Sequence, residues 1–135
     1  VAVGGPIGDP APWVMGAAVL VWTAGFDIIY ATQDVECDVR DGVHSMPADY
    51  GVPAALIQAR LAHVATVVLL AAGGLLAQAG WPWFLGIAFA AALLAYENSI
   101  VRAPDLSRVN AAFFTVNGII AMVVFAGALT DRLLG

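Results

Sequence analysis

Residues 64–77 read VATVVLLAAGGLLA, a run with no charged side chain. The run lies within an apolar block at 53–79, and similar blocks occupy 12–32, 83–101 and 109–129. A helix needs about 20 mostly apolar residues to cross the hydrocarbon core of a bilayer, and each block meets that length. Charged residues make up only 11% of the 135 positions, whereas soluble domains carry about 25%. The sequence predicts an all-α integral membrane helical bundle with four transmembrane helices.

The distribution of arginine predicts how the bundle is oriented. Four spans place the first and third connections on one side of the membrane, and that side receives most of the basic residues. They are Arg40, Arg60, Arg102 and Arg108, whereas the other side receives only Arg132. By the positive-inside rule, both connections are expected in the cytoplasm. The net charge of −5 and the absence of lysine argue against nucleic acid as a partner.

Acidic residues concentrate in residues 25–49, GFDIIYATQDVECDVRDGVHSMPAD. If the first helix continued through this segment at about 100° per residue, Asp34 and Asp38 would fall on the same face as Asp27. Asp41 would lie close to that face, and Glu36 would lie opposite. The wheel therefore predicts carboxylates projecting together from the cytoplasmic end of a membrane helix.

Such an array of acids repels itself unless a cation is present. Mg²⁺ prefers oxygen ligands and commonly bridges carboxylates to substrate phosphates, so the segment is expected to be a Mg²⁺–diphosphate site in which Asp34 and Asp38 are functional. Arg40 and His44 are expected to contact phosphate oxygens. Arg60 is expected either to contact a phosphate or to extend its side chain to the membrane surface. A solvated acidic loop is the alternative, and it is favoured for Glu36 and Asp49.

The pattern Asp27-x6-Asp34-x3-Asp38 followed by RDGVHSMP resembles the second aspartate-rich motif of the UbiA superfamily of membrane prenyltransferases. The resemblance is closest to the 4-hydroxybenzoate polyprenyltransferase-like branch, which includes enzymes assigned to menaquinone synthesis by the futalosine route. The stretch DLSRVNAAFFTVN at 105–117 is similar to the link into the last helix of that branch.

The resemblance implies nine transmembrane helices around a central cavity. It also implies Mg²⁺-dependent transfer of a polyprenyl group from an isoprenyl diphosphate to an aromatic acceptor. Asp34 and Asp38 match metal-binding acids, and Asp27 matches a polar position beneath them, so these three are the expected catalytic residues. The first motif, N-x-x-x-D-x-x-x-D, is absent before Asp27. Residues 1–135 are therefore expected to be the C-terminal part of one such domain, about helices six to nine, and to lack activity alone.

Two other classes of function remain open on the residues alone. Acids within the membrane also mark ion and proton paths, so a transporter or channel is one alternative. A non-catalytic membrane subunit is the other. His63 lies one turn after Arg60, on the same face. An interhelical hydrogen bond is favoured for it over a role as a catalytic base. Asn110 and Asn117 are seven residues apart and are expected on one face, either toward the cavity or in helix packing.

Overall fold

The computed structural model describes residues 7–102, 105–107 and 109–134. Its elements are seven helices, of which η1 is π-helical, and no strand occurs within the described ranges. In chain order they are α1 (Pro10–Ala31), α2 (Val35–Asp41), α3 (Met46–Tyr50), α4 (Val52–Leu76), α5 (Trp81–Ile100), η1 (Ala111–Val116) and α6 (Asn117–Leu134). Four helices are long and apolar enough to cross a membrane. The predicted all-α membrane bundle is therefore confirmed.

The membrane helices begin at recognisable local signals. Asp9 caps α1 by accepting a hydrogen bond from the backbone N–H of Ala11, and Pro10 occupies the first turn. Proline suits that position because its missing N–H would have no partner within the helix. Pro53 and Pro82 hold the same place in α4 and α5. Each of these helices thus starts within about two residues of its predicted position.

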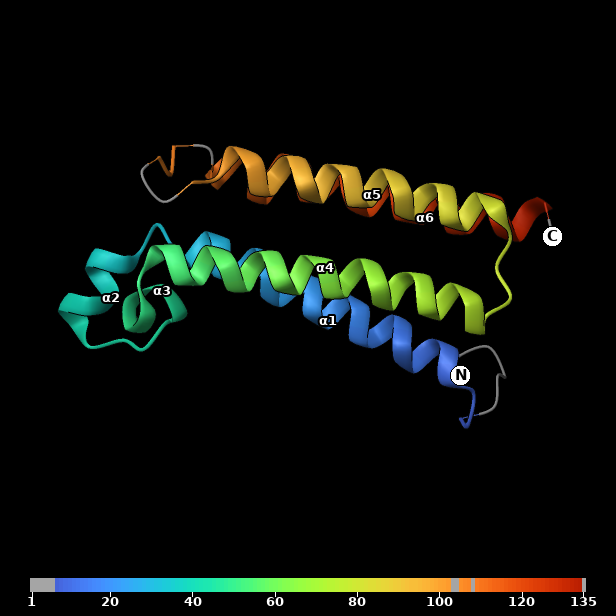
Figure 1. Ribbon diagram of the computed structural model, residues 1–135, viewed down its shortest axis with the longest axis horizontal. Coiled ribbons are helices and arrows are strands. Elements are labelled where there is room, and N and C mark those ends of the chain that lie inside the picture. The colour runs from blue at the N-terminus through green and yellow to red at the C-terminus, as the bar shows by residue number, and fades with distance from the viewer. Residues whose placement is uncertain (1–6, 103–104, 108, 135) are drawn as a thin grey trace.

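Figure 1 shows the long helices arranged as two antiparallel pairs. α1 packs most closely against α4, and α5 packs most closely against α6. The α2–α3 segment and the link that follows α5 lie at one end of the bundle, which we call the acidic end (Figure 1). The start of α1 and the end of α6 lie at the opposite end (Figure 1). The two polar connections therefore share one end, as the sequence predicts.

Glycines permit the closest approaches between helices. A Cβ added at Gly86 of α5 would lie 3.2 Å from the Cα of Gly127 on α6, so the two backbones nearly touch. On α4, a Cβ at Gly73 would lie 2.9 Å from the sulfur of Met15, and a Cβ at Gly74 would collide with the ring of Trp83. Small residues at helix interfaces allow this packing where no hydrophobic force drives helices together. Gly73 and Gly74 therefore let Met15 and Trp83 pack directly against the backbone of α4.

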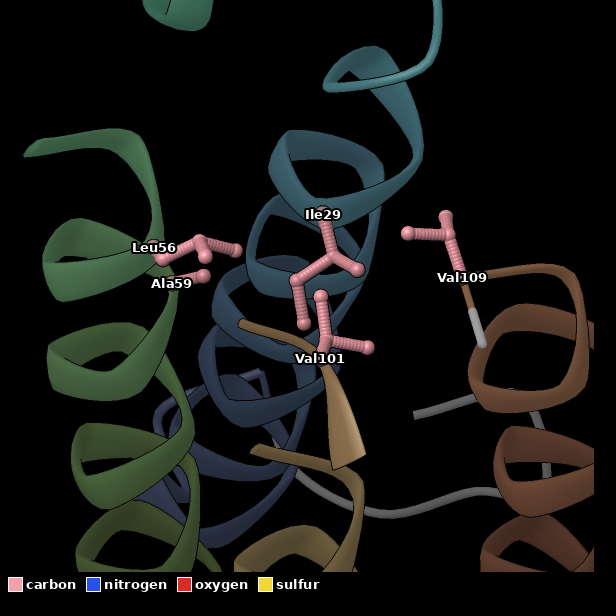
Figure 2. Packing of buried hydrophobic residues seen from close by; sticks show 5 residues of the cluster. All are labelled: Ile29, Leu56, Ala59, Val101 and Val109. Atoms are coloured by element: carbon pink, nitrogen blue, oxygen red, sulfur yellow. The ribbon is translucent and has the colours of Figure 1, made fainter. Parts of the chain in front are cut away.

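A small apolar core closes the bundle beneath the acidic end. Figure 2 shows Ile29 of α1 between Leu56 and Ala59 of α4 on one side and Val109 on the other. Val101, at the end of α5, packs below them (Figure 2). Residues of α1, of α4, of the end of α5 and of the segment before η1 therefore meet at the level where α1 ends.

The condition of the helical wheel does not hold, and one predicted boundary is wrong. The acidic segment does not continue the first helix, because α1 ends at Ala31 and α2 begins at Val35. The last helix runs to Leu134 rather than 129 and is preceded by the π-helical turn η1. A π-helical turn rotates each residue less than an α-helix does, so the seven-residue repeat from Asn110 to Asn117 does not keep one face. Asn117 is buried, whereas Asn110 is exposed.

Candidate functional site

The break after α1 is a tight turn held by local hydrogen bonds. The backbone N–H groups of Gln33 and Asp34 donate to the carbonyls of Tyr30 and Ala31, at 3.1 and 3.2 Å. The hydroxyl of Thr32 donates to the carbonyl of Ile29 at 2.6 Å. These bonds satisfy carbonyls that the end of a helix would otherwise leave free. The turn redirects the chain, so α2 points away from the axis of α1 (Figure 1).

The turn is also tied to the opposite helix pair. The side-chain amide of Gln33 donates to Oδ1 of Asn110 at 3.2 Å. The ring of Tyr30 meets the ring of Phe114 edge to face, with centroids 6.4 Å apart. These two contacts join the end of α1 to the start of the last membrane helix. The polar connections at the acidic end therefore form one connected surface.

Asp34 and Asp38 stand one helical turn apart. Asp34 is the N-cap residue of α2, and its carbonyl accepts the backbone N–H of Asp38 at 2.8 Å. Side chains at positions i and i+4 lie on the same side of a helix. The spacing prediction for this pair thus holds on α2, although Asp27 belongs to a different helix. The carboxylates of Asp27 and Asp34 are exposed, and that of Asp38 is half-buried.

The segment after α2 folds back onto Asp38. Gly42 ends α2 in the left-handed region, with φ of 68°, and the backbone N–H of Val43 donates to the carbonyl of Asp38 at 2.8 Å. Glycine adopts this conformation without the steric cost that a side chain would bring. The reversal places Ser45 beside Asp38, and the hydroxyl of Ser45 donates to Oδ2 of Asp38 at 2.6 Å.

Arg40 and His44 are paired with acids of their own segment. Arg40 donates two hydrogen bonds to the carboxylate of Asp41, at 2.7 and 3.1 Å, and these hold the pKa of Asp41 below its ordinary value. Nδ1 of His44 lies 2.9 Å from Oδ1 of Asp49. All of these side chains are exposed. Exposed ion pairs contribute little free energy. Arg40 and His44 can therefore each exchange the acid that they now contact for a phosphate at a small cost in free energy.

No complete metal cluster forms from the side chains alone. Within residues 7–102, 105–107 and 109–134, no group of three or more His, Cys, Asp or Glu side chains could hold a metal ion. Asp34 and Asp38 supply two carboxylates on one face. Magnesium is commonly held by one or two carboxylates, with water and substrate phosphates completing the shell. The donor set therefore fits a Mg²⁺ ion whose remaining ligands come from a diphosphate.

Arg60 belongs to a different helix from Asp34 and Asp38. It is exposed on α4 and lines a cleft of about 350 Å³ between α4 and α5. The lining includes His63 and Asn98 but no acidic residue. The prediction that Arg60 and His63 share a face is thereby confirmed, since both line this cleft. The prediction that Arg60 contacts a diphosphate stays a prediction.

A buried polar network within the bundle was not predicted from the sequence. Asn117 of α6 donates to Oε1 of Glu97 on α5 at 3.2 Å, and its Oδ1 accepts the indole N–H of Trp22 at 2.9 Å. Glu97 is 0% exposed. An acid inside an apolar stretch was the available signal, because such residues seldom face lipid. The network joins three helices below the acidic end.

His63 forms a second internal link. The side-chain amide of Asn98 lies 2.8 Å from Nδ1 of His63, so α4 and α5 are joined by an interhelical hydrogen bond, as expected. Two side-chain atoms buried among the described residues have no hydrogen-bond partner there, His63 Nε2 and Glu97 Oε2. A buried polar atom without a hydrogen-bond partner costs free energy, so the unpaired atoms of His63 and Glu97 each lower the stability of the bundle.

Comparison with known proteins places the chain in a family. The profile of the UbiA prenyltransferase family matches residues 1–119. The 4-hydroxybenzoate octaprenyltransferase of Saccharophagus degradans is 33% identical over 126 residues, which cover 92% of this chain and 41% of that protein. The protein of the same name from Alkalilimnicola ehrlichii is 33% identical, with coverage of 93% and 42%. That of Cupriavidus necator is also 33% identical, with coverage of 87% and 41%.

No solved structure matches the chain. The chain spans about two-fifths of the length of the curated relatives it matches. The matched region contains the acidic segment, the turn that separates it from α1, and three of the four membrane helices in full. The aspartate spacing, the helical membrane bundle and the profile match agree, and the chain belongs to the UbiA prenyltransferase family.

Proposed function

We propose that this chain carries the second aspartate-rich half of an enzyme that transfers a polyprenyl group from an isoprenyl diphosphate to an aromatic acceptor in quinone biosynthesis. The observation that carries the proposal is the α2 segment, where Asp34 and Asp38 lie on one face outside the membrane helix. The names of the relatives favour 4-hydroxybenzoate as the acceptor, and a menaquinone precursor is the other candidate.

The residues of the acidic end have distinct roles in this proposal. Asp34 and Asp38 hold Mg²⁺, and Ser45 orients Asp38 through its hydrogen bond. Arg40 and His44 release their acid partners and donate to diphosphate oxygens. The bound cation would offset the charge of the leaving diphosphate as the allylic C–O bond breaks. Asp27, one helix earlier, lies on the exposed face of α1, where an acid within the membrane is a candidate functional group.

The aromatic acceptor then attacks the carbon from which the diphosphate departs. An aromatic C–C bond forms, the C–O bond breaks, and the ring loses a proton to restore aromaticity. The apolar walls of the bundle keep water away from the electron-poor prenyl carbon. Because the first motif is absent from this sequence, we expect the 135-residue chain alone to have no activity. We also place the acidic end in the cytoplasm, on the side that the arginines favour.

A transporter is the alternative with a structural observation in its favour. Glu97 and His63 are buried within the membrane helices, where titratable groups commonly line ion paths. The exposed acids gather at one end of the bundle instead of across its depth, and this favours chemistry at the membrane surface. A non-catalytic membrane subunit is the third possibility.

The test uses membranes from cells that express the whole reading frame containing this chain. Prenyl transfer is measured with Mg²⁺, a polyprenyl diphosphate and 4-hydroxybenzoate, for wild type, Asp34→Ala and Asp38→Ala. We expect Mg²⁺-dependent product in the wild type and a loss of about 100-fold or more in both variants. Glu36→Ala is the matched control, because Glu36 is an exposed acid of the same helix on another face.

The control separates a specific site from a general need for negative charge. Equal losses in all three variants would contradict the assignment of Asp34 and Asp38. Wild-type activity that both aspartate variants retain would do the same. If no aromatic acceptor is prenylated, and vesicles containing the protein show an ion flux that depends on Glu97, the transporter replaces the transferase.

A further inference from the structure

The cleft between α4 and α5 has a polar end and an apolar interior. Its polar lining is Arg60, His63 and Asn98, and its apolar lining includes Val64, Val68 and Ala91. Arg60 and Asn98 lie at the acidic end of their helices, and Val68 and Ala91 lie deeper in the bundle. From Arg60 to Val68 the cleft follows α4 for about 12 Å at 1.5 Å per residue. The cleft thus runs from the membrane surface inward.

Arg60 presents an unpaired positive charge at the polar end. None of the ion pairs among the described residues includes it. Asn98 is already engaged, since its amide donates to the carbonyl of Leu94 at 2.8 Å and meets His63 at 2.8 Å. Arg60 is therefore the group in the described lining whose charge is available to an anion.

The backbone of Arg60 lies about 12 Å along α4 from its start, below the boundary between hydrocarbon and headgroups. α4 has 25 residues and is about 37 Å long, so it exceeds a hydrocarbon core of about 30 Å. Arg60 is eight residues past Val52, the first residue of α4. Helical side chains lean toward the N-terminus of their helix, and arginine extends its charged group to the interface. Its guanidinium is therefore directed toward the headgroup region on the acidic side.

We propose that this cleft binds one anionic phospholipid from the leaflet on the acidic side. Its phosphate pairs with Arg60, and one acyl chain lies along Val64, Val67 and Val68. Basic pockets between transmembrane helices are known to bind anionic headgroups. The cleft volume of about 350 Å³ is in the range of ligand sites. This inference does not rest on the proposed function, because it concerns lipid binding and a different pair of helices from the α2 site.

A polyprenyl diphosphate has the same chemistry, an anionic head on an apolar chain. The acid-free lining favours the phospholipid, because the diphosphate would arrive with Mg²⁺ and the cleft offers that ion no carboxylate. A zwitterionic lipid is disfavoured, because no acidic residue lies in the lining to meet its ammonium group. Arg60 is accordingly assigned to the lipid.

The test is a lipid titration of the full protein in lipid-depleted detergent micelles, read by native mass spectrometry. Phosphatidylglycerol is compared with phosphatidylcholine for wild type, Arg60→Ala and Arg102→Ala. We expect the wild type to prefer phosphatidylglycerol and Arg60→Ala to weaken its first binding step by about fivefold. Arg102→Ala should leave that step unchanged, because Arg102 is an exposed arginine near the same end but outside the cleft.

A second pair of variants tests the acyl-chain position. Ala91→Phe fills the cleft without altering charge, and we expect it to weaken phosphatidylglycerol binding. Ala92→Phe is the matched control on an exposed part of α5 outside the cleft lining. Equal effects of Arg60→Ala and Arg102→Ala would overturn the proposal, as would unchanged binding in Ala91→Phe. Unchanged lipid binding in Arg60→Ala with a raised KM for polyprenyl diphosphate would return Arg60 to the substrate.

Discussion

The imidazole of His63 occupies the space that a side chain at Gly25 would need. A Cβ built on Gly25 of α1 would lie 2.5 Å from Cδ2 and 2.6 Å from Nε2 of His63 on α4. The same ring meets the amide of Asn98 on α5. One histidine therefore joins three membrane helices, and it does so only because α1 has no side chain at the point of contact.

Replacing Gly25 tests this contact. We expect Gly25→Ala to lower the free energy of unfolding by about 1–3 kcal/mol, because overpacking displaces the His63 ring or the helix. Gly16→Ala is the control on the same helix, since a Cβ there meets nothing within 4 Å. It should stabilise by up to about 1 kcal/mol through helix propensity. Thermal unfolding in detergent measures both, and equal effects at the two glycines would contradict the packing described.

Ser45 provides a test of how Asp38 is positioned. Ser45→Ala removes the hydroxyl that donates to Asp38 and also the N-cap of α3. We expect the full enzyme to need several times more Mg²⁺ for half-maximal prenyl transfer, since a charge-assisted hydrogen bond contributes about 1.5–3 kcal/mol. Ser45→Thr keeps the hydroxyl and should retain the wild-type Mg²⁺ requirement. A threonine variant as impaired as the alanine variant would assign the effect to packing.

Asn117 tests the buried network. Asn117→Leu leaves Oε1 of Glu97 and the indole N–H of Trp22 without their present partner. Each stranded buried group costs about 1–3 kcal/mol, so we expect a marked loss of thermal stability. Asn110→Leu breaks the exposed bond from Gln33 and should cost less than 1 kcal/mol, about the value of a partly hydrated hydrogen bond. If Asn117→Leu and Asn110→Leu lose similar stability in thermal unfolding, burial does not determine how much each hydrogen bond contributes to stability.

The backbone approach of α5 and α6 gives a further prediction. Gly127→Ala places a methyl group 3.2 Å from the Cα of Gly86 and 3.3 Å from the carbonyl oxygen of Pro82. Backbone atoms cannot rotate away, so we expect the helices to separate and the free energy of unfolding to fall by about 1–3 kcal/mol. Gly118→Ala on the same helix meets nothing within 4 Å and should be neutral or stabilising. Disulfide cross-linking between cysteines placed on α5 and α6 would report the separation.

The membrane helices were predictable because their signal is local. Apolar length and the proline at each helix start locate α1, α4 and α5 to within a few residues. The helical wheel grouped Asp27 with Asp34 and Asp38 because it assumes one continuous helix, whereas the chain turns at Thr32–Asp34. What ends α1 is a set of bonds, including the one from Gln33 to Asn110, a residue 77 positions away. Such a contact has no counterpart in the local sequence pattern.

The acidic pair could likewise be predicted from a local pattern, whereas the buried network could not. Asp34 and Asp38 are four residues apart, so any helix through both places them together, and the spacing alone predicted this. Glu97 and Asn117 meet only because α5 and α6 pack side by side. The π-helical turn before Asn117 also shifts that residue off the face that a regular helix would give it. Which side chains become partners through tertiary packing can be identified only from the structure.

The pairing of α1 with α4 and of α5 with α6 bears on how the chain enters the bilayer. Each pair is an antiparallel hairpin, and the acidic segment is the connection within the first one. Six of the ten acids lie at 27–49, in or next to that connection. If the acidic end is cytoplasmic, as we propose, a hairpin that inserts as a unit leaves this connection on the side where the ribosome releases it. The acids of the connection, from Asp34 to Asp49, then avoid the hydrocarbon core, where a charged side chain is costly.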